Sequence, residues 1–422
     1  MREVAIFGHI TVMETIPDPS AARETAPDPS PLWTAAPTTA EEVAAALRRA
    51  ADARQPIQIR GAGTKRGWGG PIREAAAVLD MRGLNRVLAH EHGDMTATVE
   101  AGATLREVNR ALAVHGQWLP LDPPFADTAT IGGILATNDS GPLRQRYGTP
   151  RDLVIGIRLA TTDGVLSKAG GQVVKNVAGY DLGKLMAGSF GSLAAIVSAT
   201  FKLSPIPQAS KTLRLEIDAP AGVARVVTTV MASQLEPLGF EIAWRAGREA
   251  QERHEVLLCF ASLDAVVDAQ VAQAHALLKG LATRVDTLSS EREPAAWREH
   301  ADQIWTDADR DAAVVRTSWL PANIDAVLTA VKACADADAI MIGRAAIGAG
   351  LVRIGGTVDA QARAIDALRR SPAVGNVTIA RGSPPLLARV DAWPADTGRA
   401  RLFTSLQHAF DPAHVLVGQG PR

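Results

Sequence analysis

Residues 171–197 read GQVVKNVAGYDLGKLMAGSFGSLAAIV, and this stretch decides how the chain is interpreted. A Lys-Asn-x-x-Gly-Tyr-Asp core at 175–181 is followed by Gly-Ser-Phe-Gly-Ser-Leu at 188–193. Small residues at this density let a backbone approach a large flat ligand closely, because few side chains stand in the way. The stretch therefore indicates a ligand-binding segment.

The length and charge of the chain set its broad class. With 422 residues it is longer than one domain usually is, so two domains or one domain with an insert are expected. Its 44 Lys and Arg against 45 Asp and Glu give a formal net charge of -1, which predicts no nucleic-acid partner and no polybasic membrane surface. No apolar run in the sequence reaches the ~18 residues of a membrane span.

The two cysteines, Cys259 and Cys334, lie in apolar surroundings and are interpreted as small buried hydrophobes. Two thiolates cannot ligate a four-thiolate iron–sulfur cluster, so any such cluster would belong to a partner. The N-terminus lacks a basic start followed by a long apolar core, so no signal peptide is expected. These features predict a cytoplasmic protein that meets the inner face of the membrane, if at all, through partners.

The N-terminal segment, residues 1–31, is predicted to be a disordered lead. It repeats Pro-Asp-Pro-Ser at 17–20 and 27–30, a pattern that nucleates neither helix nor sheet well. Further along, Pro205 and Pro207 end a β-branched run and predict a domain boundary. The two predicted domains are 32–207 and 208–422.

Local patterns predict helices and strands in both domains. Thr39 with Glu42, and Thr104 with Glu107, form capping boxes that start helices. Residues 121–148 are expected to be loop-rich, because Gly and Pro recur throughout. The expected helices are 39–54, 104–115, 221–234, 265–281, 323–336 and 359–370, and the expected strands are 57–60, 95–100, 153–160, 165–168, 194–203, 213–217, 255–260 and 351–354.

Gly61-Ala62-Gly63-Thr64-Lys65 directly follows the first of these strands. Its backbone amides could form an anion nest for a pyrophosphate, and the alternative is an ordinary loop. The segment is not a Walker A motif, which needs Gly-x-x-x-x-Gly-Lys-Ser/Thr. It is not a Rossmann fingerprint either, because Arg66 occupies the position of the last glycine, and this disfavours a nicotinamide cofactor.

Further polar and small residues lie between this loop and the opening stretch. Thr130-Ile131-Gly132-Gly133 offers amides and a hydroxyl, and Asn138 and Ser140 add polar groups, although a structural turn cluster is the alternative. Lys175 or Arg146 could place a positive charge at the N1–C2 carbonyl locus of a flavin, where a cation stabilises the reduced anionic form. The alternative for either residue is a surface salt bridge.

Taken together, the three segments resemble the FAD-binding domain of the vanillyl-alcohol oxidase and p-cresol methylhydroxylase family, over about residues 32–207. Within that family the pattern is most similar to glycolate oxidase FAD-binding subunits. The resemblance is carried by IRGAGTK at 59–65, ATIGG at 129–133, SGPLRQRYGTPRDLVIG at 140–156 and the opening stretch.

The resemblance implies an α+β fold, with an FAD-binding domain of the p-cresol methylhydroxylase type followed by a smaller α+β domain that forms the cap and the C-terminal part. It implies FAD as the cofactor. Some members attach FAD through a histidine of the loop, and Gly61–Lys65 has none, so noncovalent binding is expected.

The same resemblance implies a function. It predicts oxidation of glycolate to glyoxylate within a complex that also holds a second FAD-linked subunit and an iron–sulfur subunit. One alternative is a noncatalytic subunit that carries FAD or assists assembly. Another is a stand-alone FAD-linked oxidase of a different 2-hydroxyacid, such as D-lactate.

The family pattern also assigns the cofactor-binding residues. It implies that Gly61–Lys65 wrap the pyrophosphate, that 130–133 and 138–141 approach the flavin and ribityl chain, and that 188–197 closes from the other side. The predicted cofactor-binding residues are Arg60, Gly61, Ala62, Gly63, Thr64, Lys65, Pro123, Thr130, Ile131, Gly132, Gly133, Asn138, Ser140, Gly141, Arg146, Gly148, Lys175, Asn176, Gly188, Ser189, Gly191, Leu193, Ile196 and Val197.

Some family features are absent from the sequence. Related 2-hydroxyacid dehydrogenases carry a His-x-x-His-Gly-like segment, which this sequence lacks, so no catalytic base is named. His90-Glu91-His92 is interpreted as a solvated turn rather than a metal site. The C-terminal Asn-Pro-Gly signature is replaced by Val417-Gly418-Gln419-Gly420, which predicts weak or no contact of this tail with FAD.

Overall fold

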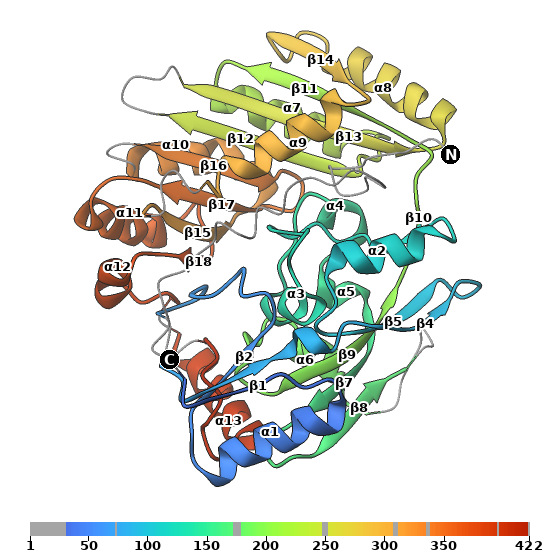
Figure 1. The fold of residues 1–422 in the computed structure, drawn as a ribbon. Coiled ribbons are helices and arrows are strands. Elements are labelled where there is room, and N and C mark those ends of the chain that lie inside the picture. The colour runs from blue at the N-terminus through green and yellow to red at the C-terminus, as the bar shows by residue number, and fades with distance from the viewer. Residues whose placement is uncertain are drawn as a thin grey trace.

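A computed structural model of the chain describes residues 31–71, 74–171, 179–246, 252–306, 311–334, 338–394 and 396–420. The predicted N-terminal lead, apart from its last residue, and the predicted ligands Lys175 and Asn176 lie outside these ranges. Within them, the first half of the chain forms the lower part of the view in Figure 1, and a large sheet with its helices forms the upper part.

Two sheets organise the first half. A three-stranded parallel sheet has the order β1-β3-β2, and a five-stranded antiparallel sheet has the order β4-β5-β9-β7-β8. A short antiparallel pair joins β6 to β10. The strands are β1 (Trp33–Ala35), β2 (Ile57–Arg60), β3 (Ala77–Asp80), β4 (Val87–Glu91), β5 (Thr96–Glu100), β6 (Gln117–Trp118), β7 (Val154–Ala160), β8 (Leu166–Gly170), β9 (Ala195–Lys202) and β10 (Ser204–Pro205).

The two helices that the sequence predicts in the first half begin where expected. Both capping boxes form: Thr39 with Glu42 caps one helix, and Thr104 with Glu107 caps the next. The stretch 121–148 differs from the loop-rich expectation, because burial of Ile134 and Leu135 stabilises a short helix despite two glycines in its first turn. The helices are α1 (Ala40–Asp52), α2 (Leu105–Ala113), α3 (Ile131–Thr137), α4 (Arg144–Tyr147), α5 (Pro150–Leu153) and α6 (Leu182–Met186), with a 3₁₀ turn η2 (Met81–Gly83).

The second half is built on the larger sheet. Its eight antiparallel strands have the order β14-β11-β13-β12-β16-β17-β15-β18. These strands are β11 (Ala209–Ile217), β12 (Gly239–Ala246), β13 (Arg253–Ser262), β14 (Arg284–Leu288), β15 (Ala313–Ser318), β16 (Ala339–Arg344), β17 (Ala349–Ile354) and β18 (Val377–Arg381). Three of them, β11, β13 and β17, contain the strands predicted for this half.

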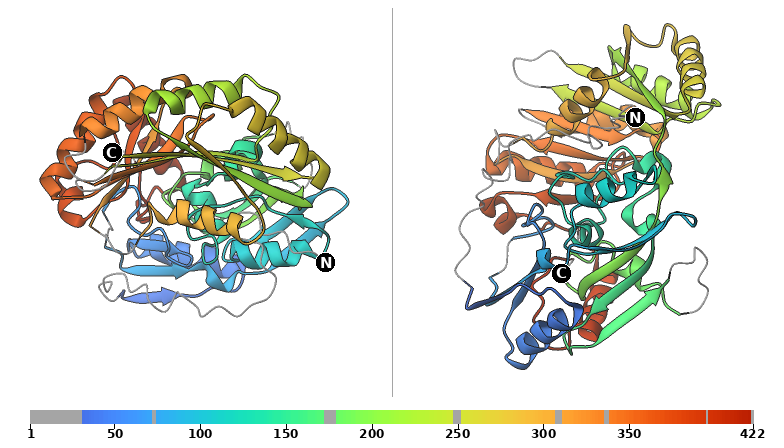
Figure 2. Two further views of the ribbon diagram at one scale, coloured as in Figure 1. Left: turned by 90° about the horizontal axis from the view of Figure 1, so that it is seen from above. Right: turned by 45° about the vertical axis from the view of Figure 1, so that its right-hand side comes forward.

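Helices cover the outer face of this sheet, as the view from above in Figure 2 shows. The four predicted helices correspond to α7, α8, α10 and α11, and their apolar residues join those of the sheet in one core. The opposite face is turned toward the first half, with α9 lying against it (Figure 2). The helices are α7 (Pro220–Met231), α8 (Asp264–Leu278), α9 (Arg292–Asp302), α10 (Ile324–Cys334), α11 (Val358–Arg370) and α12 (Pro384–Arg389), with a 3₁₀ turn η3 (Pro321–Asn323).

The chain ends by returning to the first half. Helix α13 (Thr397–Phe410) lies beside α1 at the bottom of Figure 1. The tail then runs parallel to β2: the amide of Ile57 donates to Val415 O at 2.8 Å, and the amide of Val417 donates to Ile57 O at 3.2 Å. The last residues of the predicted second domain, 208–422, therefore pack on the first half, while the domain boundaries themselves stay predictions.

Candidate functional site

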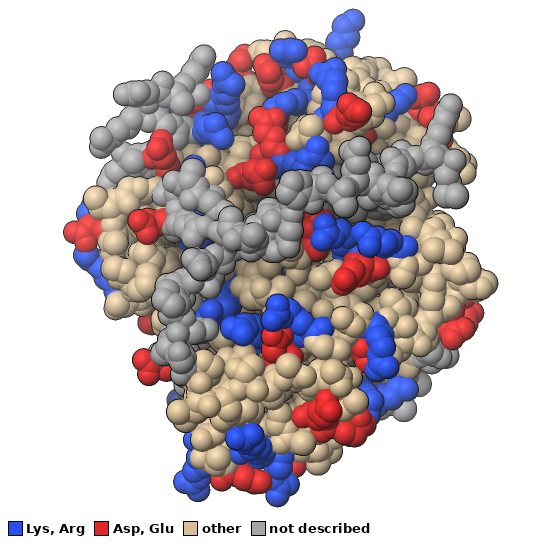
Figure 3. Space-filling model, in the orientation of Figure 1, with Lys and Arg blue, Asp and Glu red and all other residues tan. Residues whose placement is uncertain are grey.

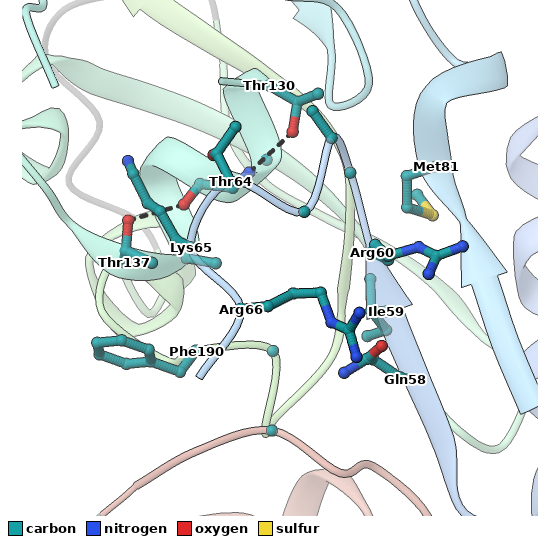
Figure 4. Close-up of a pocket in the computed structure, with 18 of the residues that line it drawn as sticks. Gln58, Ile59, Arg60, Thr64, Lys65, Arg66, Met81, Thr130, Thr137 and Phe190 are labelled. Atoms are coloured by element: carbon teal, nitrogen blue, oxygen red, sulfur yellow. Dashed lines mark hydrogen bonds between the residues drawn. The ribbon is translucent and has the colours of Figure 1, made fainter. Parts of the chain in front are cut away.

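A cavity with about 1100 Å³ of space, part of it open to solvent, lies at the carboxyl end of β2. Four segments from distant parts of the sequence meet around it: the Gly61–Lys65 loop, the start of α3, the end of the opening stretch, and the C-terminal tail. Figure 4 shows how these segments surround the cavity. Its lining consists of Gln58, Ile59, Arg60, Gly61, Ala62, Gly63, Thr64, Lys65, Arg66, Gly67, Trp68, Met81, Ala101, Ala129, Thr130, Gly132, Gly133, Ala136, Thr137, Phe190, Gly191, Ala194, Ile196, Val417, Gly418 and Gln419.

Small residues bring these segments together. A Cβ atom at Gly61 would overlap the Thr130 hydroxyl, and one at Gly132 would lie 2.9 Å from the Cβ of Ala101. Gly63 has a φ of +74°, a conformation that a side chain disfavours. The end of the opening stretch joins α3 through the backbone, because Phe190 N donates to Ala136 O at 2.8 Å. The segments therefore form one continuous wall.

The charge of the lining is positive. Arg60, Lys65 and Arg66 line the cavity, and no Asp, Glu or His is found among the lining residues that the structure describes. Backbone amides of a glycine-rich loop add further positive potential. The residues present fit a large cofactor that carries a pyrophosphate. The cations would balance its negative charge, and the glycines would let the backbone approach it closely.

A second group of charged residues lies where the cavity meets the large sheet. Lys65 Nζ is 3.4 Å from Asp139 Oδ2, and Arg316 Nη2 of β15 donates to Asp139 Oδ1 at 3.1 Å. Burial and the nearby positive charge of Arg316 lower the pKa of Lys65, although Asp139 opposes this shift. Trp68 packs beside both cations, with its ring centroid 5.5 Å from Lys65 Nζ and 5.2 Å from Arg316 Cζ.

The loop that carries Asp139 is held from two sides. Asp122 accepts hydrogen bonds from the amides of Gly141, at 2.9 Å, and Leu143, at 2.7 Å. Burial raises the pKa of Asp122 to about 7, while these amides and Arg344 oppose the shift. From the sheet side, Arg344 Nη2 donates to Ser140 O at 3.0 Å. The two halves of the chain are thus connected through this loop.

Eleven of the predicted cofactor ligands lie in the cavity lining, and eleven others are described elsewhere. Those in the lining are Arg60, Gly61, Ala62, Gly63, Thr64, Lys65, Thr130, Gly132, Gly133, Gly191 and Ile196. Those outside the lining are Pro123, Ile131, Asn138, Ser140, Gly141, Arg146, Gly148, Gly188, Ser189, Leu193 and Val197. The remaining two, Lys175 and Asn176, are outside the described residues.

Burial or pairing with other protein groups explains why several predicted ligands lie outside the lining. Ile131, Leu193 and Val197 are almost fully buried in the apolar cores. Asn138 ends α3 in a left-handed conformation, with its side chain accepting a hydrogen bond from the amide of Arg151 at 3.1 Å. Arg146 is exposed and pairs with Glu236 at 2.9 Å, which is the surface salt bridge considered as its alternative.

The structure also places the C-terminal tail at this cavity. Val417, Gly418 and Gln419 are among the lining residues, while the expected weak or absent contact of this tail with FAD stays a prediction. The pairing of Leu416 in this tail with Ile57 is a long-range contact, for which the sequence carries no local signal. Arg316 was also missed, because a lone arginine on a β-branched strand carries no motif.

The histidines of the predicted solvated turn, His90 and His92, are not among the residues that line this cavity. The ring of His92 stacks on the ring of His115, with centroids 4.5 Å apart. His90 shares a hydrogen bond with Gln117 at 2.9 Å. Across the described part of the chain, no group of three or more His, Cys, Asp or Glu residues is arranged to hold a metal ion. In the same ranges, no helix is long and apolar enough to cross a membrane.

The mixed helix-and-sheet fold and the positive, glycine-lined cavity define a protein that binds a large anionic cofactor. Comparison with known proteins identifies this cofactor. Residues 31–170 match the family described as FAD binding domain. The chain therefore contains an FAD-binding domain of the p-cresol methylhydroxylase type, and FAD is its cofactor. Noncovalent attachment stays a prediction.

Curated relatives are similar to part of the chain. Glycolate oxidase subunit GlcD of Bacillus subtilis is 34% identical over 206 residues, which are 49% of this chain and 44% of the relative. Glycolate oxidase subunit GlcE of Escherichia coli is 36% identical over 184 residues, or 43% and 51% of the two chains. D-lactate dehydrogenase of Archaeoglobus fulgidus is 32% identical over 217 residues, or 51% and 48%. The chain thus matches about half the length of these relatives.

A solved structure supports the fold over a longer range. An alkyldihydroxyacetonephosphate synthase matches with a TM-score of 0.68 at 18% identity, covering 92% of this chain and 77% of the synthase. At this identity the likeness concerns the fold alone. It includes the eight-stranded sheet as well as the FAD-binding domain, because nearly the whole chain is covered.

Proposed function

We propose that this chain is the FAD-binding subunit of a glycolate dehydrogenase complex and takes part in the oxidation of glycolate to glyoxylate. The observation that carries the proposal is the cavity of the FAD-binding domain, which is lined by glycines and by Arg60, Lys65 and Arg66. The similarity to two proteins named as glycolate oxidase subunits supports the substrate. The similarity to a D-lactate dehydrogenase supports the broader class of 2-hydroxyacids.

Several residues of the chain would hold the cofactor. The amides of Gly61–Lys65, with the guanidinium groups of Arg60 and Arg66, would bind the pyrophosphate by charge and hydrogen bonding. Gly191 and Ile196 would form the opposite wall, and the tail at Val417 would close the cavity. FAD, when bound, supplies the hydride acceptor. Glycolate gives up a hydride from its hydroxyl-bearing carbon and a proton from its hydroxyl, which leaves glyoxylate.

A complex is part of the proposal. The electrons from glycolate must leave the chain, and its two cysteines cannot ligate a four-thiolate iron–sulfur cluster. The relatives named as GlcD and GlcE are each called a subunit of glycolate oxidase. We therefore propose a second FAD-linked subunit and an iron–sulfur subunit as partners, in a cytoplasmic complex at the inner face of the membrane.

One observation favours a second candidate function. The described lining residues include no Asp, Glu or His, the side chains that most often act as general bases. A chain without a base would hold FAD to relay electrons or to support assembly, while a sister subunit oxidises the substrate. A stand-alone oxidase of D-lactate is the third candidate, supported by the Archaeoglobus relative.

Anaerobic titration of the purified full chain with glycolate tests these candidates. The expected result is bound flavin whose oxidised absorbance is bleached by glycolate. Bound flavin that stays oxidised with both glycolate and D-lactate would overturn oxidation by this chain and favour the relay or assembly function. Turnover of D-lactate without partners would favour the stand-alone oxidase. Purification of the complex from its native cell, with iron analysis of the partners, tests the subunit assignment.

A further inference from the structure

Two cations, Lys65 and Arg316, share a single carboxylate, that of Asp139. Lys65 Nζ lies 3.4 Å from Asp139 Oδ2, and among the described residues it makes no shorter polar contact, although it is buried. Arg316 makes one hydrogen bond, from Nη2 to Asp139 Oδ1 at 3.1 Å, within the described part of the chain. The remaining donors of the Arg316 guanidinium and the buried ammonium of Lys65 therefore lack hydrogen-bond acceptors among the described residues.

Arg144 adds a further positive charge near this group. Burial lowers the pKa of Arg144, as do the nearby charges of Arg344 and Arg316, while Asp152 opposes the shift. Arg344 itself is nearly buried and is paired with Glu241 at 3.4 Å. An anionic ligand beside Arg316 would reduce the repulsion among these arginines, and the partly buried position strengthens such a contact.

The orientation of Lys65 separates this group from the cations that face the cofactor loop. Figure 4 shows the Lys65 side chain directed away from the guanidinium groups of Arg60 and Arg66. Lys65 and Trp68 both line the cavity, and the Trp68 ring lies beside the two cations of the group. Trp68 in turn stacks on Trp305 of the second half, with ring centroids 4.6 Å apart. The group thus lies at the end of the cavity that faces the large sheet.

We propose that Lys65 and Arg316 bind the carboxylate of the acid substrate beside the face of Trp68. This inference rests on the proposed function for the identity of the acid, and it adds the residues that recognise it. A carboxylate takes charge-assisted hydrogen bonds from an ammonium and a guanidinium, and it brings the negative charge that this group lacks. Asp139 then acts as a positioning residue that holds the two cations at a fixed separation.

Oxalate, a two-carbon anion with no transferable hydride, is the probe. Oxalate binding to the flavin-loaded full chain is followed by the shift of the flavin absorbance, and the flavin content is measured separately. We expect Arg316→Gln to weaken oxalate binding about 10- to 100-fold, the loss of one charge-assisted hydrogen bond, with flavin content unchanged. Arg316→Lys keeps the charge but loses the planar donor group, so its affinity should lie between those of the two proteins.

The control is Arg214→Gln. Arg214 lies on β11 of the same sheet, its side chain is 31% exposed against 30% for Arg316, and it pairs with Glu255. This variant should bind oxalate as tightly as the parent protein. Glycolamide, which lacks the negative charge, should not compete with oxalate in the parent protein.

The other outcomes would overturn the inference. Loss of flavin with unchanged oxalate affinity, in Arg316→Gln or in Lys65→Met, would assign the cations to the FAD phosphates. Equal oxalate affinity in Arg316→Gln and Arg214→Gln would remove Arg316 from the site. Failure of the proposed function is distinct, because it appears as absent bleaching by glycolate in the parent protein whatever the oxalate titration shows.

Discussion

Gly61 and Thr130 touch so closely that the position of the Thr130 hydroxyl leaves no room for a Cβ atom at residue 61. The two residues are nearly seventy positions apart in the sequence, yet their contact joins the loop after β2 to the start of α3. The Thr130 hydroxyl also accepts the amide of Gly133 at 3.4 Å, as the N-cap of α3. A glycine at 61 is therefore required by packing between two walls of the FAD cavity.

Gly61→Val should loosen this contact and release FAD. The added side chain must displace Thr130, and overpacking of this kind costs about 1–3 kcal/mol of stability. Gly93→Val is the matched control, because a Cβ at Gly93 meets no atom within 4 Å. The flavin content after gel filtration and the midpoint of thermal unfolding measure the effect. Equal flavin retention in the two variants would contradict the assigned role of this contact.

Gly63 lies in the loop that would hold the pyrophosphate. The nearest protein atom to a Cβ at this position is Arg66 Cδ, at 3.5 Å, so the surrounding side chains leave room. Within the protein, the restriction comes from the backbone φ of +74°. Gly63→Ala should therefore cost about 1–2 kcal/mol through the backbone alone. Gly63→Asn, which tolerates the left-handed region better, should recover part of this loss in a denaturation assay.

Replacement of Arg344 should uncouple the two halves of the chain. Arg344 donates to Ser140 O at 3.0 Å and pairs with Glu241 at 3.4 Å, and Glu241 has no exposed surface. Arg344→Met leaves that carboxylate with the His300 ring, 3.3 Å away, as its remaining side-chain partner among the described residues. Breaking a buried pair in this way costs about 3–5 kcal/mol.

A double-mutant cycle separates the charge effect from packing. Glu241→Gln removes the carboxylate that Arg344→Met would leave uncompensated, so the double variant should lose less stability than the sum of the single variants. Urea unfolding of the four proteins gives the coupling free energy. Additive losses would show that Arg344 and Glu241 act independently.

Asp122 should make stability depend on pH in a defined direction. Burial raises the pKa of Asp122 to about 7 in the folded chain, above its ordinary value of 3.8. Between these values the folded protein retains a proton that the unfolded chain releases. The contribution of this group to the free energy of unfolding therefore falls as the pH rises through this window, with a slope of at most about 1.4 kcal/mol per pH unit, and is constant above it.

Asp122→Asn tests this dependence, because the amide does not titrate. The difference in the free energy of unfolding between the parent protein and the variant should shrink from pH 4 toward pH 7. The variant also loses one of the two amide hydrogen bonds from Gly141 and Leu143, which adds a penalty that does not change with pH. A difference that stays constant across this range would exclude a raised pKa of Asp122.

The sequence predicts local features of this fold well and long-range ones poorly. Both capping boxes form as expected, because Thr39 and Thr104 each satisfy backbone amides three residues away. The loop at Gly61–Lys65 was identified because its composition and its place after a strand are local signals. By contrast, α3 was missed because it depends on burial of Ile134 and Leu135, which no local pattern reveals. Arg316 reaches Asp139, the partner of the cavity-lining Lys65, only through the packing of the large sheet on the first half.

The C-terminal tail gives the last prediction. A Cβ at Gly418 would overlap the backbone of Gly191 and Ser192, so the tail lies against the end of the opening stretch and seals the cavity there. Leu416 is 3% exposed, which anchors the tail independently of Gly418. Gly418→Val should therefore shift the residues that close the cavity while the core contact at Leu416 persists. We expect faster release of FAD, measured by flavin fluorescence after dilution, together with a loss of thermal stability, because the added side chain meets backbone atoms. A release rate equal to that of the Gly93→Val control would show that the tail does not retain the cofactor.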